Sequence, residues 1–370
     1  AISEVEEDET TPGTNYERDR TIKLLQGEKR ERRHFRSIAR DVCKRYFSVM
    51  PAFQMRGIDS LNVCLSPRLP PLAKTDLQKL EERNITLIED TRFSTETVES
   101  LKSLIPESLP EEEAKAVLHI LLQREKRKTP QVDLFADIYK SPTEEDDELG
   151  YENEEDGEIV EASNVSIDQR KQVKPAVITG AAIQLTHQFD RPFYHSFDRL
   201  ADASSDNIER FISLAGAWVD ELETRLLRNR SVELDAKQQH TILTNRANEL
   251  MHQWDFPHCD SVRKLIRFIA TRCIAKTMEP NAPLGEGANA FGIPQDDMNR
   301  IEEKAPELVP VIHYAIAYNA IYLKENYICK NRQWCLFQLG GVPIVANRLT
   351  LSRGGFCEGG IRDLLESIKK

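Results

Sequence analysis

The segment 194–222 carries the strongest helical pattern in the chain and most constrains how the chain can fold. Its apolar residues recur at intervals of three and four, so that they form one stripe along a helix. The stripe comprises Ile208, Phe211, Ile212, Ala215, Trp218, Val219, Leu222 and Leu226. Ser204 and Ser205 are good N-cap residues, and Asp206 suits the positive end of the helix dipole. We therefore expect a helix over about 207–228 that buries this stripe.

The C-terminal half is predicted to continue as a compact, mostly helical region. Further helices are expected at 236–252, 261–278, 295–304, 306–325 and 361–368, with a loop over 282–294. The runs 334–339 and 344–351 flank Gly340 and Gly341, a pattern typical of a β-hairpin. Helices followed by a hairpin indicate a winged-helix-like module. A plain helical bundle with a β-ribbon is the alternative.

The N-terminal half shows a different alternation. Apolar runs at 60–65 and 85–89 read as strands, and helices are expected at 74–83, 95–103 and 111–127. This order predicts a small α/β unit with a parallel strand pair. Asp90 would then lie at the carboxyl end of a strand, where such folds place chemistry. The alternative for Asp90 is a helix-capping or surface carboxylate.

Charge divides the chain. Residues 141–161 hold eleven Asp and Glu and no Lys or Arg, which accounts for the whole net charge of −11. The remainder is neutral overall, so that nucleic-acid binding is neither implied nor excluded. The predicted organisation is mainly α with an α/β part. It comprises a disordered tail (1–15), a small α/β domain (16–140), an acidic linker (141–163), a helical lid-like domain (164–255) and a winged-helix-like domain (256–370).

Cysteine usage and hydropathy bear on the compartment. The seven cysteines include no CxxC pair, and no secretory signal precedes them, which favours reduced thiols in a cytoplasm. No apolar run is long enough to cross a membrane, so that no membrane partner is expected. His240, His252, His258 and Cys259 match no zinc-binding spacing, and we expect no metal in this chain.

Sequence motifs for catalysis are absent. The chain contains no GxxxxGK[ST], so that it cannot hold a triphosphate with a P-loop of its own. GxSxG and HExxH are also missing. Gly285, Gly287 and Gly292 follow no predicted strand, and they are expected to permit a tight loop rather than to cradle phosphates. Whether the chain belongs to an enzyme is therefore open.

Three blocks nevertheless resemble a known family. YHSFDRLADASSDNIERFISLAG, GEGANAFGI and LSRGGFCEGGIRDLLES occur in this order between about 180 and 368. They resemble the C-terminal half of prokaryotic AAA+/STAND-type ATPases, which are related to the origin-recognition ATPases and found in antiphage-defence loci. The resemblance implies a cytoplasmic oligomer and an ATP-binding core upstream or on a partner chain. It also implies a defence effector protein or DNA as the partner.

The same resemblance suggests nucleotide-contacting residues. Arg210 matches a sensor-type arginine that meets the γ-phosphate, Arg199 is the second candidate, and Asn207 lies beside them. An arginine suits this task because it offers a permanent charge and a bidentate fork. The alternative is that each arginine forms an ordinary helical ion pair, Arg210 with Asp206 and Arg199 with Asp198 or Asp202.

Three functions are therefore weighed. The first is the lid and winged-helix portion of a defence ATPase that couples nucleotide state to the binding of DNA or of an effector protein. The second is a winged-helix DNA-binding regulator without ATPase activity, in which Arg263, Lys264 and Arg267 contact DNA. The third is an effector enzyme with its site in the 60–127 unit, near Asp90.

Overall fold

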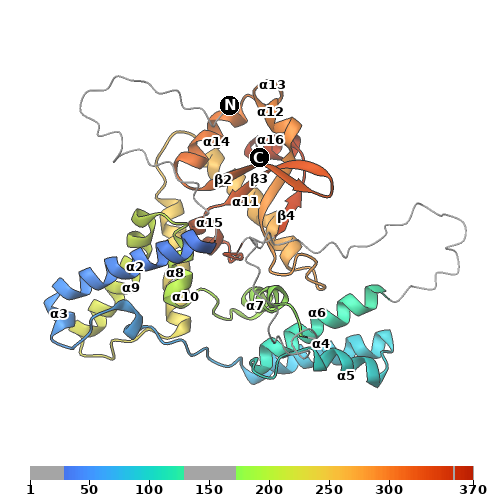
Figure 1. Ribbon diagram of the computed structural model, residues 1–370, viewed down its shortest axis with the longest axis horizontal. Helices are drawn as coiled ribbons and strands as arrows, with labels where there is room; N and C mark the ends of the chain where they lie inside the picture. Colours follow the sequence, from blue (N-terminus) through green and yellow to red (C-terminus); the bar gives the residue numbers. More distant parts are fainter. Residues whose placement is uncertain (1–28, 129–171, 353–354, 370) are drawn as a thin grey trace, which may run out of the picture.

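The computed structural model describes residues 29–128, 172–352 and 355–369 (Figure 1). The predicted tail 1–15 and the linker 141–163 lie outside these residues. The described part is mainly α-helical and contains one four-stranded mixed sheet, as the predicted fold class requires. Its elements gather into a helical bundle, a second helical group and an α/β part.

The helical bundle forms around α9. Its helices are α2 (Lys29–Val49), α3 (Pro51–Gln54), α8 (Phe197–Ala203), α9 (Ile208–Leu227) and α10 (Ala236–His252). The predicted helix over 207–228 is thus confirmed. Its buried side chains are Phe211, Leu214, Ala215, Trp218, Val219 and Leu222. The predicted stripe was wrong at Ile208 and Ile212, which are exposed because the buried face is centred nearer Leu214.

The start of α9 also differs from the prediction. Asn207 is the N-cap, and its side chain accepts a hydrogen bond from the backbone N–H of Arg210. Ser204 and Ser205 instead form the turn between α8 and α9, in which Ser205 and Asp206 adopt positive φ angles of 51° and 57°. The two helices therefore meet at a sharp corner and share one apolar core.

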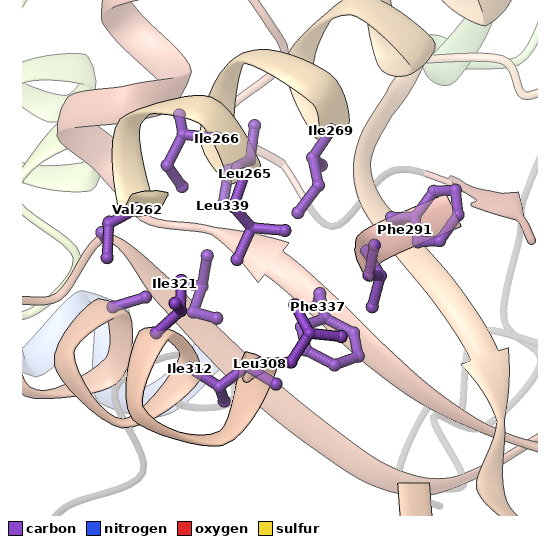
Figure 2. Packing of buried hydrophobic residues seen from close by; sticks show 14 of the residues in the cluster. Val262, Leu265, Ile266, Ile269, Phe291, Leu308, Ile312, Ile321, Phe337 and Leu339 are labelled. Atoms are coloured by element: carbon purple, nitrogen blue, oxygen red, sulfur yellow. The ribbon is translucent and has the colours of Figure 1, made fainter. Parts of the chain in front are cut away.

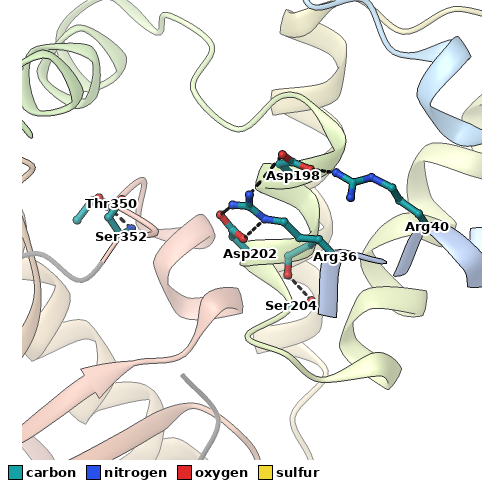
Figure 3. A network of polar contacts seen from close by, with 8 residues as sticks. Arg36, Arg40, Asp198, Asp202, Ser204, Thr350 and Ser352 are labelled. Atoms are coloured by element: carbon teal, nitrogen blue, oxygen red, sulfur yellow. Dashed lines mark hydrogen bonds and ion pairs between the residues drawn. The ribbon is translucent and has the colours of Figure 1, made fainter. Parts of the chain in front are cut away.

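Helix α2 belongs to this bundle, although about 150 residues separate it from α8. Phe35, Ala39, Cys43 and Phe47 bury its apolar face in the bundle core. On the other face Arg36 donates two hydrogen bonds to Asp202, and both Arg36 and Arg40 contact Asp198 (Figure 3). The basic helix is thus fixed by carboxylates of α8.

The predicted N-terminal α/β unit was wrong. Residues Leu61–Cys64 form a 3₁₀ turn, η1, and the second predicted strand lies inside α4 (Lys74–Thr91). Leu80, Asn84 and Leu87 are the buried residues of α4, at helical spacing. Asn84 belongs to the buried face because its amide group hydrogen-bonds to the Lys115 carbonyl and to His119. Asp90 is exposed near the end of this helix, so the basis for an enzyme site there is gone.

The second helical group is formed by α4, α5 (Thr95–Ser103), α6 (Glu111–Lys128) and α7 (Pro175–Phe189). Its cores are small, and α7 joins it to the rest of the molecule. At Gly180 of α7 the backbone approaches the 282–287 loop so closely that a Cβ atom would lie 2.0 Å from the Gly285 carbonyl oxygen.

The α/β part contains the largest apolar core. Its elements are α11 (Cys259–Thr277), β1 (Ala288–Pro294), α12 (Gln295–Asn299), α13 (Ile301–Lys304), α14 (Leu308–Ala317), β2 (Ile321–Cys329), β3 (Arg332–Leu339), β4 (Gly355–Glu358) and α16 (Ile361–Lys369). The strand order is β2-β3-β1-β4, with only the β1–β4 pair parallel. From α11 to β3, helices and strands follow one another in the order of a winged helix, and β4 and α16 are added to it. We call the whole α/β part, together with α15, the winged-helix part.

Figure 2 shows how this core is built. Side chains of α11 lie over the sheet, and α14 closes the core from the other side. The labelled residues are Val262, Leu265, Ile266, Ile269, Phe291, Leu308, Ile312, Ile321, Phe337 and Leu339. All of them are nearly or fully buried.

Three element predictions in this part were wrong. The helix predicted over 306–325 ends at Ala317, and the chain then forms β2, which pairs with β3. Consequently the hairpin lies at 321–339, and residues Gly341–Ala346 form a short helix, α15, instead of its second strand. The loop predicted over 282–294 contains β1, a central strand of the sheet.

Candidate functional site: a buried polar junction

Two of the three residues predicted to contact nucleic acid, Arg263 and Lys264, bind backbone carbonyl groups. Arg263 donates hydrogen bonds to the carbonyl oxygens of Met251, His252 and Trp254, and so it fixes the end of α10. The Lys264 ammonium reaches the Ile368 carbonyl of α16 at 3.5 Å. Arg267 is exposed. The three side chains therefore do not form one basic surface.

Arg210 lies at the joint between α9 and the winged-helix part. Its guanidinium donates to the Tyr318 carbonyl, at 3.4 Å, directly after α14. Close by, Ser205 Oγ accepts a hydrogen bond of 2.8 Å from the Gly341 N–H at the start of α15. Both residues line a pit that has room for about one water molecule, far too small for a nucleotide.

Tyr322 shows that this joint is polar but closed. Its hydroxyl is buried next to the Ser205 side chain. Burial raises the pKa of Tyr322 to about 12. The joint thus connects α8 and α9 to α14 and α15 through a few polar contacts, and it offers little space for a ligand.

Arg199 is half-buried and has a different environment. Its guanidinium lies over the Phe193 ring, 3.7 Å from the ring centre. Asp198 and Asp202, its expected helical partners, are engaged by Arg36 and Arg40. Among the described residues, no hydrogen bond or ion pair of the Arg199 side chain is found. Burial lowers the pKa of this guanidinium, since the charge has lost water.

His195 and His240 are two titratable rings at the 193–196 turn that precedes Arg199. His240 Nδ1 accepts hydrogen bonds from the backbone N–H groups of Phe193 and Tyr194, so that the neutral ring carries its proton on Nε2. That Nε2 is buried, and it has no partner in the described residues. Burial, followed by the charge of Arg348, lowers the pKa of His240 to about 4. Burial, followed by Arg199 and Arg191, lowers that of His195 to about 4.

The backbone between these rings is strained. Ser196 has φ 83° and ψ 153°, a region that is almost confined to glycine. The Gln239 side-chain oxygen holds it there by accepting the Ser196 N–H at 2.7 Å. Gln239 is itself fully buried, and its carbonyl accepts the Trp218 indole N–H. Ser196 also lines a surface groove of about 250 Å³ that begins beside η1. The strain is thus imposed by the bundle next to an accessible surface.

Two further arginines complete the junction. Arg191 pairs with Glu112 and Glu113 at the start of α6, and only 2% of its side chain is exposed. Arg348 pairs with Asp190 at 2.8 Å. These contacts bring the α4–α7 group, the bundle and the winged-helix part together around residues 187–199. We use the term polar junction for Arg191, His195, Arg199, His240, Glu286 and Arg348.

Glu286 brings the 282–287 loop into the polar junction. One of its carboxylate oxygens is buried without a hydrogen-bond partner in the described residues, and its charge acts on Arg199. Arg191 Nε, His195 Nδ1 and His240 Nε2 are buried and unpartnered in the same sense. Unsatisfied polar atoms of this kind, together with shifted pKa values, are typical of functional sites.

The chemistry of the polar junction favours an anion over a metal ion. Its histidines are neutral, and Arg191 and Arg348 already have carboxylate partners, so Arg199 is the cation with donors to spare. Within the described residues no group of three or more His, Cys, Asp or Glu is arranged to hold a metal. An oxyanion such as a phosphoryl group would meet both a charge and hydrogen-bond donors at Arg199.

Sequence reasoning found only part of this site. Arg199 was a candidate, but four other residues of the junction were not. His240 and Arg348 lie far from Arg199 in the sequence, and Arg191 and His195, although close to it, belong to no recognisable motif. Asn207 proved to be a helix cap. The two sequence blocks that contain Arg199 and Glu286 do lie close enough for their charges to interact. That both blocks belong to the resemblance described for the sequence was the one signal that could have located the junction.

Comparison with known proteins adds no further guide. No family model matches the chain, no curated protein matches it, and no solved structure matches it. Among the described helices, none combines the length and apolar character needed to span a lipid bilayer.

Proposed function

We propose that the chain is the lid and winged-helix portion of an AAA+/STAND-like ATPase of the antiphage-defence type, which couples nucleotide state to binding of an effector protein. The observation that carries the proposal is Arg199, a half-buried cation whose side chain forms no hydrogen bond or ion pair among the described residues, at the place where the charges of Asp202, Glu113 and Glu286 converge from different parts of the structure. ATP would be held mainly by a core upstream or on a partner chain, within an oligomer, because this chain has no P-loop.

The arrangement supports a phosphate-responsive role for Arg199. A guanidinium that lies on an aromatic ring keeps its fork of N–H donors in one plane, ready for two oxygens. A phosphoryl group would restore the favourable partner that burial has removed. We therefore assign the main nucleotide contact to Arg199 rather than to Arg210. Arg210 would transmit the response, since its guanidinium connects α9 to the end of α14.

A route from Arg199 to the winged-helix part follows from the contacts. Arg199 lies on α8, and α8 ends at the turn whose Ser205 Oγ accepts the Gly341 N–H. A Cβ atom on Gly341 would lie 1.9 Å from the Ala203 carbonyl oxygen, so that α8 and α15 touch through their backbones. A small displacement of α8 would therefore move α15 rather than be absorbed by side chains.

Charge favours an effector protein over DNA as the partner. Helix α14 occupies the place of the recognition helix of a winged helix, and it contains no Lys or Arg. Residues 295–317 hold five Asp and Glu against two Lys and Arg. Such a surface repels a phosphate backbone, whereas DNA binding depends on its neutralisation by basic residues.

The phosphate role is tested by calorimetric titration of the chain with ATP and with inorganic tripolyphosphate. We expect Arg199→Gln to weaken tripolyphosphate binding at least tenfold, and Arg210→Gln, the matched control from the same helical pair, to leave it within twofold. Arg199→Lys separates charge from geometry and should lose less than the Gln variant. Equal binding by all variants, or no binding by the unaltered chain, would overturn the phosphate role.

The choice of partner is tested by fluorescence anisotropy with a labelled 30-base-pair duplex over a range of salt concentrations. We expect weak binding that does not depend on the wing. Tight, steeply salt-dependent binding that is lost in a Lys330→Glu, Arg332→Glu variant at the tip of the β2–β3 wing would instead favour the DNA-binding regulator.

A further inference from the structure

We propose that Cys357 and Cys273 form an oxidation site, in which a hydroperoxide converts the two thiols into a disulfide between β4 and α11. This inference is independent of the proposed function, and it concerns the face of the sheet next to α11. It rests on the placement of the two side chains, on their unequal exposure and on the charges around them.

The fold brings the two cysteines together from positions 84 residues apart. Cys273 lies on α11, and its thiol donates to the Ala290 carbonyl of β1 at 3.4 Å. The next residue of β1, Phe291, pairs with Cys357 in the parallel β1–β4 ladder. Cys273 therefore lies over the strand pair that contains Cys357. Both side chains pack in the same apolar core, in which α11 lies against β4.

Exposure and charge give the two thiols different roles. Cys273 is fully buried, whereas Cys357 is half-buried and open to small reagents. The neighbouring Cys273 thiol lowers the pKa of Cys357, and the charges of Lys276 and Arg272 lower it further. The pKa of Cys273 is raised, by Cys357 and by burial. A thiolate is the reactive form, so Cys357 is the nucleophile and Cys273 the resolving thiol.

The chemistry balances with a hydroperoxide as the only oxidant. The Cys357 thiolate attacks the terminal peroxide oxygen, an S–O bond forms, the O–O bond breaks, and the alcohol (water, for hydrogen peroxide) leaves with a proton. The Cys273 sulfur then attacks the Cys357 sulfenic acid. An S–S bond forms, the S–O bond breaks, and the hydroxide leaves as water with the Cys273 proton. Two thiols thus give two electrons to one peroxide.

Cys43, Cys64, Cys335 and Cys329 are poorly suited to this reaction. Burial raises the pKa of Cys43 to about 12, that of Cys64 to about 11 and that of Cys335 to about 12. Cys329 is half-buried like Cys357, but its pKa is raised, and it lies on the edge strand β2. Cys329 is therefore the matched control for exposure without activation.

The test is peptide mass mapping of the full chain after treatment with one equivalent of hydrogen peroxide, with and without dimedone to trap sulfenic acids. We expect one dominant disulfide, Cys273–Cys357, that dithiothreitol reverses. In Cys273→Ser the dimedone adduct should appear on Cys357 and no disulfide should form. In Cys357→Ser neither product should form, and Cys329→Ser should behave as the unaltered chain does.

The unaltered chain alone can decide the matter if a variant does not fold. A map in which Cys357 stays reduced while Cys329 or Cys259 is modified would overturn the proposal, as would equal dimedone labelling of all half-buried cysteines. Formation of the predicted disulfide should also raise the midpoint of thermal unfolding, because it restricts the unfolded chain. An unchanged or lower midpoint would show that the bond distorts the fold.

Discussion

Single residues of the polar junction hold several segments of the fold in place. His240 holds the turn at 193–194 by accepting two backbone N–H groups, and it can do so only while Nδ1 is unprotonated. Its ring stacks on Tyr194, whose hydroxyl donates to the carbonyl oxygens of Ile344 and Leu349. One neutral imidazole thus supports contacts that reach the winged-helix part.

This predicts a loss of stability at mildly acidic pH. The pKa of His240 and of His195 is about 4 in the folded chain and about 6.5 in the unfolded chain, so that the unfolded state binds more protons between these values. The stabilisation is complete above about pH 6.5 and is lost as the pH falls towards 4. Each histidine should reduce the free energy of unfolding by up to about 1.4 kcal/mol per pH unit.

Urea unfolding at intervals between pH 7 and pH 4.5 measures this slope. His240→Asn keeps an acceptor near the Nδ1 position but cannot titrate, so it should flatten the dependence. His313→Asn, at an exposed position of α14, is the control and should not change it. A slope that is the same in all three proteins would show that His240 is not responsible.

At the scale of elements, the helices with caps and a clear stripe were predictable. The helix 236–252 begins with a capping box of Asp235 and Gln238, and its predicted bounds match α10. The run 85–89 was misread because short apolar runs do not distinguish strand from helix, and the polar Asn84 interrupts the stripe of α4. Strand β1 was missed because its glycine looked like a loop signal.

Gly292 explains why that signal misled. A Cβ atom there would lie 2.6 Å from the Phe356 ring and 3.0 Å from Leu336, so that the neighbouring strands require glycine within β1. Among the described residues, some glycines therefore allow two backbone segments or a neighbouring side chain to pack closely, and others allow a turn. Gly180 of α7 and Gly216 of α9 form a contrasting pair, since both lie inside helices.

We predict opposite effects for alanine at these two positions. Gly180→Ala should destabilise the fold by about 1–3 kcal/mol, because its Cβ would overlap the Gly285 carbonyl and separate α7 from the 282–287 loop. In Gly216→Ala the added Cβ atom would meet no other atom within 4 Å. This substitution should therefore stabilise the fold by about 0.5–1 kcal/mol through the higher helix propensity of alanine. Chemical denaturation of both variants measures the difference. If Gly180→Ala were as stable as the unaltered chain, the 282–287 loop would be able to move away from α7 without cost.

At the scale of the whole molecule, the bundle, the α4–α7 group and the α/β part meet around charged side chains. Arg191 connects α6 to the bundle through Glu112 and Glu113, and nothing in the local sequence of any of the three predicts the pairing. Pairings between segments this far apart depend on the fold, so the sequence could suggest Arg199 but not its neighbours. The same reason hid the docking of α2 on α8.

Removal of Arg191 should therefore separate the α4–α7 group from the rest. Arg191→Met leaves two carboxylates without their partner in a buried site and should cost about 3–5 kcal/mol. Lys115→Met breaks more exposed pairs with Glu81 and Glu111 and should cost no more than about 1 kcal/mol. Thermal unfolding and limited proteolysis of α4–α6 would register the change. Equal stability of the two variants would contradict it.

The docking of α2 on α8 also has a consequence during biosynthesis. Arg36 and Asp202 are 166 residues apart, so a ribosome working at 5–20 residues per second needs roughly 10–30 s to supply the partner. Throughout that interval the apolar face of α2, from Phe35 to Phe47, emerges without its cover. Nascent chains of this protein should therefore present a binding site for chaperones, and α2 should become protected only after α8 and α9 have been synthesised.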